Sequence, residues 1–298
     1  MHQSNDGFEI TEKPSSPHKP VVITADSTVD LTAELLERFQ IKTIPLTIIL
    51  GNERYLDGHD FTPADIYRHY HENGSLPQTA APSIQNLCDF FESFTREGYE
   101  VVHLDISSEL SNIYNVARLA AQELEGVYVV DSQMLSTGIA LLAIEAAECR
   151  DKGMGARDIS EHLNKLRAKV STTFVLDTLD FMWKGGRCSG IIALGANLLK
   201  IKPALRLVDG KIVVFKKYRG KMEHVYRQYV LEQLHGCKIR PDHIFLTESG
   251  EIDPNVIGEL IQVIKDTSGC REIHHTSAGC TVSSHCGPKA LGVLFIEE

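Results

Sequence analysis

The sequence predicts an α/β protein of two domains, and three observations support this. Short runs rich in valine and isoleucine alternate with segments of helical periodicity through the first half, which is typical of βαβ units and a parallel sheet. In the second half, Asp209-Gly210 separates two apolar runs, which indicates a β-hairpin and therefore a mixed sheet. A length of 298 residues also favours about two domains.

We place the domain boundary near residue 169, where the alternation ends. Residues 1–19 are expected to be a disordered tail, residues 20–168 an N-terminal domain with a mostly parallel sheet flanked by helices, and residues 169–298 a C-terminal mixed α/β domain. The tail is polar and lacks the apolar stretch of a signal peptide. No apolar run is long enough to span a membrane. Seven scattered cysteines without a CxxC motif favour reduced thiols and a cytoplasmic location.

The first half has clear helix boundaries. Thr62-Pro63 is a typical helix start, and Asn73-Gly74 a typical helix end. Ile84, Leu87, Phe91 and Phe94 share one helical face, and Gly98 follows them. We expect strands at residues 21–25, 43–50, 100–106 and 127–130, and helices at residues 32–39, 62–73, 83–97, 112–125, 133–152 and 156–169.

The second half mixes a hairpin with further βα units. Its strands are expected at residues 172–176, 204–208, 212–218, 243–247, 272–276 and 291–296, with helices at residues 222–234 and 254–266. In such α/β folds, ligands bind beyond the carboxyl ends of the strands.

The net charge of −10 is unevenly distributed. Residues 1–168 carry 26 acidic and 13 basic side chains, whereas residues 169–298 carry 14 acidic and 17 basic side chains. The segment 184–221 holds ten basic residues and one acid, Asp209. The acidic total argues against general nucleic-acid binding, while the basic segment is a candidate docking surface for an acidic partner.

Common nucleotide-binding, hydrolase and zinc-protease motifs are absent from the sequence. Cys270, His274, His275, Cys280, His285 and Cys286 lie within 17 residues, but their spacing fits no standard zinc site. His274 and His275 are adjacent in a predicted strand, so they should point to opposite faces. We therefore expect a buried strand with free thiols and no metal.

Five segments of small polar residues follow predicted strands. Loops at residues 26–30, 79–83, 107–112, 131–138 and 285–288 would meet at the carboxyl edge of a sheet. Their hydroxyls could donate hydrogen bonds to an anion. Serine, threonine and aspartate at these positions also serve as helix caps, so a purely structural role is the alternative for each.

Seven segments together resemble the DegV family. They are ADSTVDL (25–31), LPQTAAPS (76–83), ISSELSNIYNVA (106–117), VVDSQMLSTG (129–138), LDFMWKGGR (179–187), LLKIKPALRLVDGKI (198–212) and HCGPKALGVLF (285–295). These motifs occur in the family's order, and the resemblance covers about residues 20–298.

The resemblance implies a two-domain protein that binds one long-chain fatty acid between its domains and has no catalytic residue, metal or cofactor of its own. FakB-like members present the lipid to a separate fatty acid kinase, which makes acyl phosphate. The motifs imply that Thr79, Ser111 and His285 bind the carboxylate and that Arg219 contacts the kinase. Such a protein needs no membrane span or nucleic acid, and contacts a membrane surface only transiently.

The acyl chain is expected in an apolar tunnel whose candidate lining residues are Ile44, Phe174, Leu194 and Leu198. Each is also a plausible ordinary core residue. The sequence departs from the family pattern at Ala80-Ala81, where Ser-Gln is usual, and at Asn112 and Lys289, where glycine is usual. These departures affect the expected lipid and partner specificity.

Two other functions fit part of the sequence. Ser111 and His285 could serve a serine-dependent acyl ester or thioester hydrolase, although no nucleophile elbow is present. The basic segment 184–221 could contact nucleic acid, although aromatic residues there are sparse.

Overall fold

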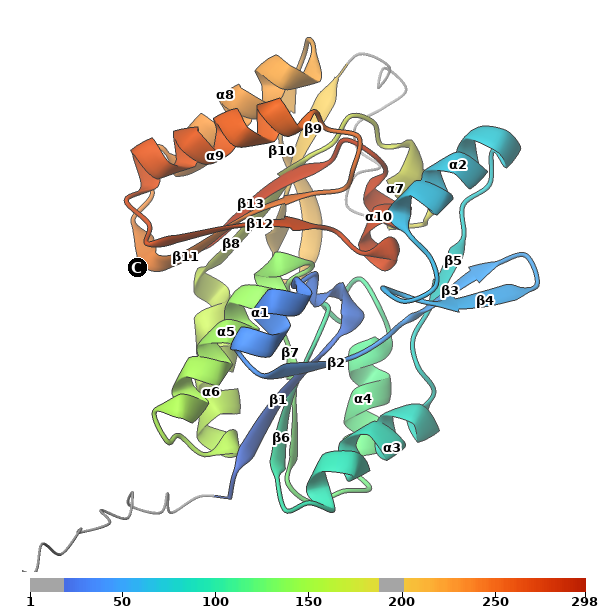
Figure 1. The fold of residues 1–298 in the computed structure, drawn as a ribbon, viewed down its shortest axis with the longest axis vertical. Helices are drawn as coiled ribbons and strands as arrows, with labels where there is room; N and C mark the ends of the chain where they lie inside the picture. Colours follow the sequence, from blue (N-terminus) through green and yellow to red (C-terminus); the bar gives the residue numbers. More distant parts are fainter. Residues whose placement is uncertain (1–18, 188–200) are drawn as a thin grey trace, which may run out of the picture.

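The computed structural model describes residues 19–187 and 201–298, which form two packed α/β units (Figure 1). The first unit is built on a parallel sheet with strand order β2-β1-β6-β7, as predicted. Its strands are β1 (Val21–Asp26), β2 (Ile41–Ile44), β6 (Glu100–Asp105) and β7 (Val127–Asp131). Every residue of β1 is buried, because a central parallel strand is covered on both faces.

Helices cover both faces of this sheet. Ile23 of β1 contacts the core beneath α5, whereas its neighbour Val22 contacts Leu87 and Phe91 of α3 on the opposite face. The helices of this unit are α1 (Ala33–Arg38), α3 (Ile84–Thr95), α4 (Ile113–Ala121), α5 (Thr137–Asp151) and α6 (Ala156–Leu166), with short 3₁₀ turns η1 (Ser27–Val29) and η2 (Arg167–Lys169).

Helix α5 lies between the two units (Figure 1). Its Ile139 and Leu142 belong to the same buried cluster as Phe174, Phe245 and Leu294 of the second sheet. A helix packed against sheets on two sides needs apolar residues around most of its circumference. Accordingly, twelve of its fifteen residues are buried.

The second unit is a six-stranded mixed sheet with order β10-β9-β8-β13-β11-β12. All neighbouring strands are antiparallel except β11 and β12, which are parallel. Helices α8 and α9 cover its outer face (Figure 1). The elements are β8 (Val170–Val175), β9 (Lys202–Val208), β10 (Lys211–Tyr218), α8 (Met222–Leu234), β11 (Ile239–Glu248), α9 (Pro254–Ser268), β12 (Glu272–Ser277) and β13 (Leu291–Glu297).

The predicted hairpin is confirmed. Asp209 and Gly210 both have a left-handed backbone, with φ of 49° and 77°, which matches a tight two-residue hairpin turn. The Ser107 hydroxyl of the first unit donates to the Gly210 carbonyl at 2.8 Å. The hairpin tip is thereby joined to the loop that precedes α4.

A small antiparallel sheet extends from the first unit and was not predicted. It contains β3 (Thr47–Leu50), β4 (Glu53–Leu56) and β5 (Gln78–Ala80), and α2 (Pro63–Asn73) connects the last two. The single strand expected at residues 43–50 is wrong. It is two strands in different sheets, separated at Pro45, which has no N–H to donate to a ladder.

The predicted ends of α2 are confirmed. Thr62 and Asp65 form a reciprocal capping box, and Gly74 ends the helix with φ of 69°. Two short helices, α7 (Asp180–Lys184) and α10 (Cys280–Cys286), were missed because each is too short to show a period. The predicted loop at residues 285–288 is therefore wrong in part, since His285 and Cys286 end α10. The first strand of the second sheet, β8, begins at Val170. The domain boundary near residue 169 stays a prediction.

Candidate functional site

A cavity lies where the first unit, the hairpin and helices α7 and α10 meet. It encloses about 610 Å³ of empty space, including solvent at its mouth. Its lining residues are mostly apolar, and none of them is an aspartate or glutamate: Leu46, Thr79, Ala80, Ala81, Ile106, Leu110, Ser111, Leu135, Met182, Arg187, Ile212, Thr281, Val282, His285 and Cys286.

The three residues predicted to bind a carboxylate all line this cavity. Thr79 comes from β5, Ser111 from the loop before α4, and His285 from the last turn of α10. Thr79 Oγ1 lies 3.2 Å from His285 Nε2, although the two are 206 residues apart. Thr79 lies within β5 of the small antiparallel sheet, so the expectation that residues 79–83 are a loop is wrong for Thr79 and Ala80.

Ser111 has a hydroxyl that can donate into the cavity. Its Oγ accepts the N–H of Ile113 at 3.3 Å, at the start of α4. Among the described residues the hydroxyl proton has no protein acceptor within hydrogen-bond range. The structural and binding roles of Ser111 are therefore compatible, because a hydroxyl can accept one bond while it donates another.

His285 is held neutral. Burial, with a smaller contribution from the nearby Arg187 guanidinium, lowers the pKa of His285 to about 4. Its Nδ1 is buried and has no hydrogen-bond partner among the described residues. The backbone of Gly185 approaches so closely that a Cβ there would lie 2.3 Å from Nδ1. Nε2 thus contacts Thr79, whereas the backbone of Gly185 covers Nδ1.

Arg187 is the charged residue that the sequence analysis did not single out. Its Nη1 donates to the Gly185 carbonyl at 2.7 Å and its Nε to the Leu110 carbonyl at 3.4 Å. Burial lowers the pKa of Arg187, and no carboxylate of the described residues pairs with it. Its position at the end of LDFMWKGGR, after two glycines, was the available signal.

This arrangement suits a monovalent anionic head group. The half-buried Arg187 guanidinium has lost part of its hydration without gaining a counterion, and a carboxylate would compensate its charge. Thr79, Ser111 and His285 supply further donors, because each hydroxyl can donate one hydrogen bond and a neutral imidazole can donate one from one of its two ring nitrogens.

A second, apolar cavity extends from the first. Its empty volume, which includes open solvent, is about 360 Å³, and it shares Leu135, Val282 and Cys286 with the first cavity. Phe174, a predicted tunnel residue, lines it. Ile44 does not line either cavity and is instead buried beside Leu87 and Phe91. Leu194 and Leu198 lie outside the described residues.

Two buried aspartates of the first unit hold the start of α10. Asp57 accepts the N–H groups of Cys280 at 2.8 Å and Thr281 at 3.2 Å, and Asp30 accepts that of Gly279 at 2.8 Å. Burial raises the pKa of Asp30 well above its ordinary value. These bonds satisfy the N–H groups at the start of α10. They therefore fix the helix that carries His285.

The site does not contain a nucleophile–base–acid relay within the described residues. His285 contacts Thr79, and no hydrogen bond joins it to Ser111. Its Nδ1 has no carboxylate partner to orient the ring. The geometry therefore gives the hydrolase alternative no support.

The two glycine departures lie outside the cavity. Asn112 is exposed before α4, and its side-chain oxygen accepts from Asn115 at 3.0 Å. Lys289 has a left-handed backbone, with φ of 62°, which explains why glycine is usual there. Its side chain belongs to a separate groove together with Lys202 and Lys221.

The family model described as DegV matches residues 20–298. The chain belongs to the DegV family. A DegV domain-containing protein of Clostridium perfringens is 30% identical over 283 residues, covering 93% of this chain and 99% of the relative. A DegV domain-containing protein of Deinococcus radiodurans is 32% identical over 284 residues, covering 92% of this chain and 98% of the relative. The family predicted from the seven motifs is thereby confirmed.

Solved DegV structures share the fold. A DegV family protein from Thermus thermophilus, described for its fatty acid binding, has a TM-score of 0.85 and 29% identity, covering 94% of this chain and 100% of that one. A Thermotoga maritima protein, described as revealing a fatty acid binding function, has a TM-score of 0.81 and 25% identity, with coverage of 94% and 100%. The predicted two-domain α/β fold class is confirmed by these DegV neighbours.

Arg219 is exposed just after β10, and so are Lys217 and Lys221. This part of the basic segment therefore faces solvent on the DegV fold. Among the described residues, no helix is long and apolar enough to cross a membrane.

Proposed function

We propose that this DegV chain binds one long-chain fatty acid. The carboxylate of the fatty acid contacts Thr79, Ser111, Arg187 and His285. The acyl chain enters the apolar cavity lined by Phe174. The observation that carries the proposal is the Arg187 guanidinium, which has no carboxylate partner among the described residues and lies with neutral donors in a cavity that adjoins an apolar one. The fatty acid binding described for the DegV proteins of Thermus thermophilus and Thermotoga maritima supports it.

The energetics favour tight binding without catalysis. Burying a methylene contributes about 0.8 kcal/mol, so 14 methylenes contribute about 11 kcal/mol as an upper bound before the costs of association. The head-group donors add specificity for an ionised acid over an alcohol, because unpaired buried donors are costly.

We further propose that the chain presents the lipid to a separate fatty acid kinase and has no chemistry of its own. The exposed basic residues around Arg219 are suited to an acidic surface on that enzyme. In this role the protein is cytoplasmic and collects its ligand during transient contact with a membrane surface.

Mass spectrometry of lipid released from the denatured, purified protein tests the binding proposal. We expect about one long-chain fatty acid per chain. A double variant with Thr79→Val and Ser111→Ala should retain much less. An empty wild-type protein that also fails to take up added fatty acid would refute the proposal.

A further inference from the structure

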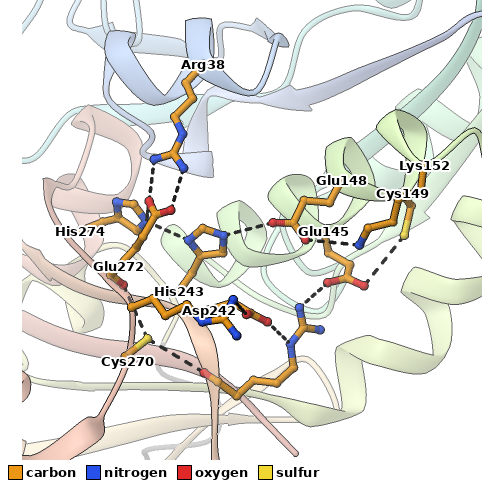
Figure 2. Close-up of polar contacts among 12 residues, drawn as sticks. Arg38, Glu145, Glu148, Cys149, Lys152, Asp242, His243, Cys270, Glu272 and His274 are labelled. Carbon is orange, nitrogen blue, oxygen red and sulfur yellow. Dashed lines mark hydrogen bonds and ion pairs between the residues drawn. The ribbon is translucent and has the colours of Figure 1, made fainter.

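A second cluster of ionisable side chains lies away from the cavity, on the seam between the two units (Figure 2). Arg38 from α1 and Glu148 from α5 face His243 of β11 and Glu272 and His274 of β12. The proposed fatty acid site uses none of these residues.

The parallel pairing of β11 and β12 brings three metal-binding side chains together. His243 pairs with Glu272, and Phe245 with His274, so residues two apart on each strand share one face. His243 Nδ1 lies 3.1 Å from His274 Nε2, and Glu272 Oε2 lies 3.7 Å from His274 Nε2. One ligand atom from each of the three lies within 4.8 Å of the others.

These separations suit a shared ion. Two nitrogens bound at about 2.0–2.1 Å to one ion, at angles between about 90° and 110°, lie roughly 2.9–3.4 Å apart. The side chains of both histidines are 10% exposed and that of Glu272 is 35% exposed. Solvent therefore reaches the cluster at Glu272, which gives an ion a route in.

The histidine rings are already oriented. Glu148 Oε1 lies 3.3 Å from His243 Nε2, and in the tautomer in which Nε2–H donates to Glu148, Nδ1 is left as an acceptor. Such a carboxylate–histidine pair is the usual outer support of a metal ligand. Phe245 lies against the His274 ring with centroids 4.7 Å apart.

We propose that His243, His274 and Glu272 bind one divalent transition-metal ion, with zinc as the representative. Two imidazoles and a carboxylate are ligands that Zn²⁺ and its first-row neighbours accept, whereas Mg²⁺ and Ca²⁺ prefer oxygen. Three protein ligands leave a position for water. Binding requires the tautomers in which His243 Nδ1 and His274 Nε2 carry no proton, because a ligating ring nitrogen must offer its lone pair.

Arg38 competes with the ion. Its guanidinium makes two bonds to Glu272, at 2.5 and 2.7 Å. An ion at the site would share Glu272 with this cation or displace it. Since Arg38 belongs to the first unit and Glu272 to the second, metal binding would weaken one ion pair across the seam.

Titration calorimetry of the full chain with ZnCl₂, and the visible spectrum of its Co²⁺ form, test the proposal. We expect one equivalent to bind. His243→Gln and His274→Gln should each weaken binding at least tenfold, and Glu148→Gln should weaken it tenfold to a hundredfold. Arg38→Gln should strengthen it. Unfolding curves of the variants show whether each one is folded.

His162→Gln is the matched control. His162 belongs to the other potential metal group, with Glu145 and Cys149, on α5 and α6. The His162→Gln variant should leave the affinity for Zn²⁺ unchanged. Because the proposed ligands include no cysteine, the spectrum of the Co²⁺ form should lack thiolate bands. Absence of binding, binding that survives both histidine variants, or loss of binding in His162→Gln would each overturn the proposal. Anomalous diffraction from a ZnCl₂-soaked crystal would place the ion directly, and an ion elsewhere would also overturn it.

Discussion

The carboxylate of Asp57 accepts the backbone N–H of Cys280 at 2.8 Å across 223 residues of sequence. Asp57 directly follows β4, whereas Cys280 begins α10. The last turn of α10 carries His285, so a residue outside the cavity sets the position of one that lines it. The small sheet thereby acts as a support for the candidate site.

Asp57→Asn should lower both stability and lipid retention. The side-chain amide introduced at position 57 can place an N–H donor against the backbone N–H groups of Cys280 and Thr281. Each buried hydrogen bond lost in this way costs about 1–3 kcal/mol of stability. Urea unfolding and mass spectrometry of retained lipid measure the two effects. Thr62→Ala is the control, because it removes the cap of α2 at a cost of about 1 kcal/mol and should leave retention unchanged. Equal retention in both variants would contradict this role of Asp57.

His285 should make the stability of the lipid-free protein depend on pH. Its pKa is about 4 in the folded chain, against about 6.5 when unfolded. The unfolded state therefore binds more protons between these values, and the free energy of unfolding should fall as pH drops from about 6.5 to 4. The contribution is at most roughly 3 kcal/mol.

Urea unfolding of delipidated protein between pH 4.5 and 7 tests this dependence on pH. His285→Gln should flatten the slope. A bound carboxylate favours the imidazolium and raises the pKa of His285, so lipid should flatten the slope of the wild type as well. An identical slope in the wild type and the variant would show that other groups control it.

Arg187→Gln should weaken fatty acid binding by roughly 10- to 100-fold, since a charge-assisted hydrogen bond contributes about 1.5–3 kcal/mol. Competition against a fluorescent fatty acid measures this affinity. A fatty alcohol of the same length is the control ligand, because it carries no charge for Arg187 to compensate. An equal loss for acid and alcohol would mean that Arg187 acts only by holding the backbone at Gly185 and Leu110.

Phe174→Ala should change the acyl chains that the protein retains. It enlarges the apolar cavity, so we expect longer or more bulky chains in the mass spectrum. Ile44→Ala is the matched core variant, because Ile44 is similarly buried but lines neither cavity. Both should lose about 2–5 kcal/mol of stability. A shifted lipid profile in Ile44→Ala alone would place the acyl chain elsewhere.

Arg219→Glu should impair acyl-phosphate formation by a reconstituted fatty acid kinase and leave lipid binding intact. The side chain is exposed, so its reversal should change docking without disturbing the core. Arg96→Glu, an exposed charge reversal at the end of α3, is the control. Loss of lipid binding together with phosphorylation would show that Arg219 supports the fold or the pocket.

Local signals in the sequence were sufficient for much of the fold. Thr62-Pro63 and Gly74 gave both ends of α2, and Asp209-Gly210 gave the hairpin, because capping and turn chemistry depend on residues within a few positions. The motifs also predicted Thr79, Ser111 and His285, which line one cavity. Pro45 was the local signal for a break between two strands, and it divides the strand expected at residues 43–50.

The family, the alternation of strands and helices, and three residues of the candidate site could be predicted from the sequence alone. The folded chain was needed to show that Arg187 joins them without a carboxylate partner among the described residues, that Asp57 holds α10, and that Ile44 belongs to a different core. It also brought His243 beside His274 through the pairing of β11 with β12. The physical reason is that burial, charge compensation and strand register depend on contacts between residues far apart in the chain, which periodicity and spacing do not encode.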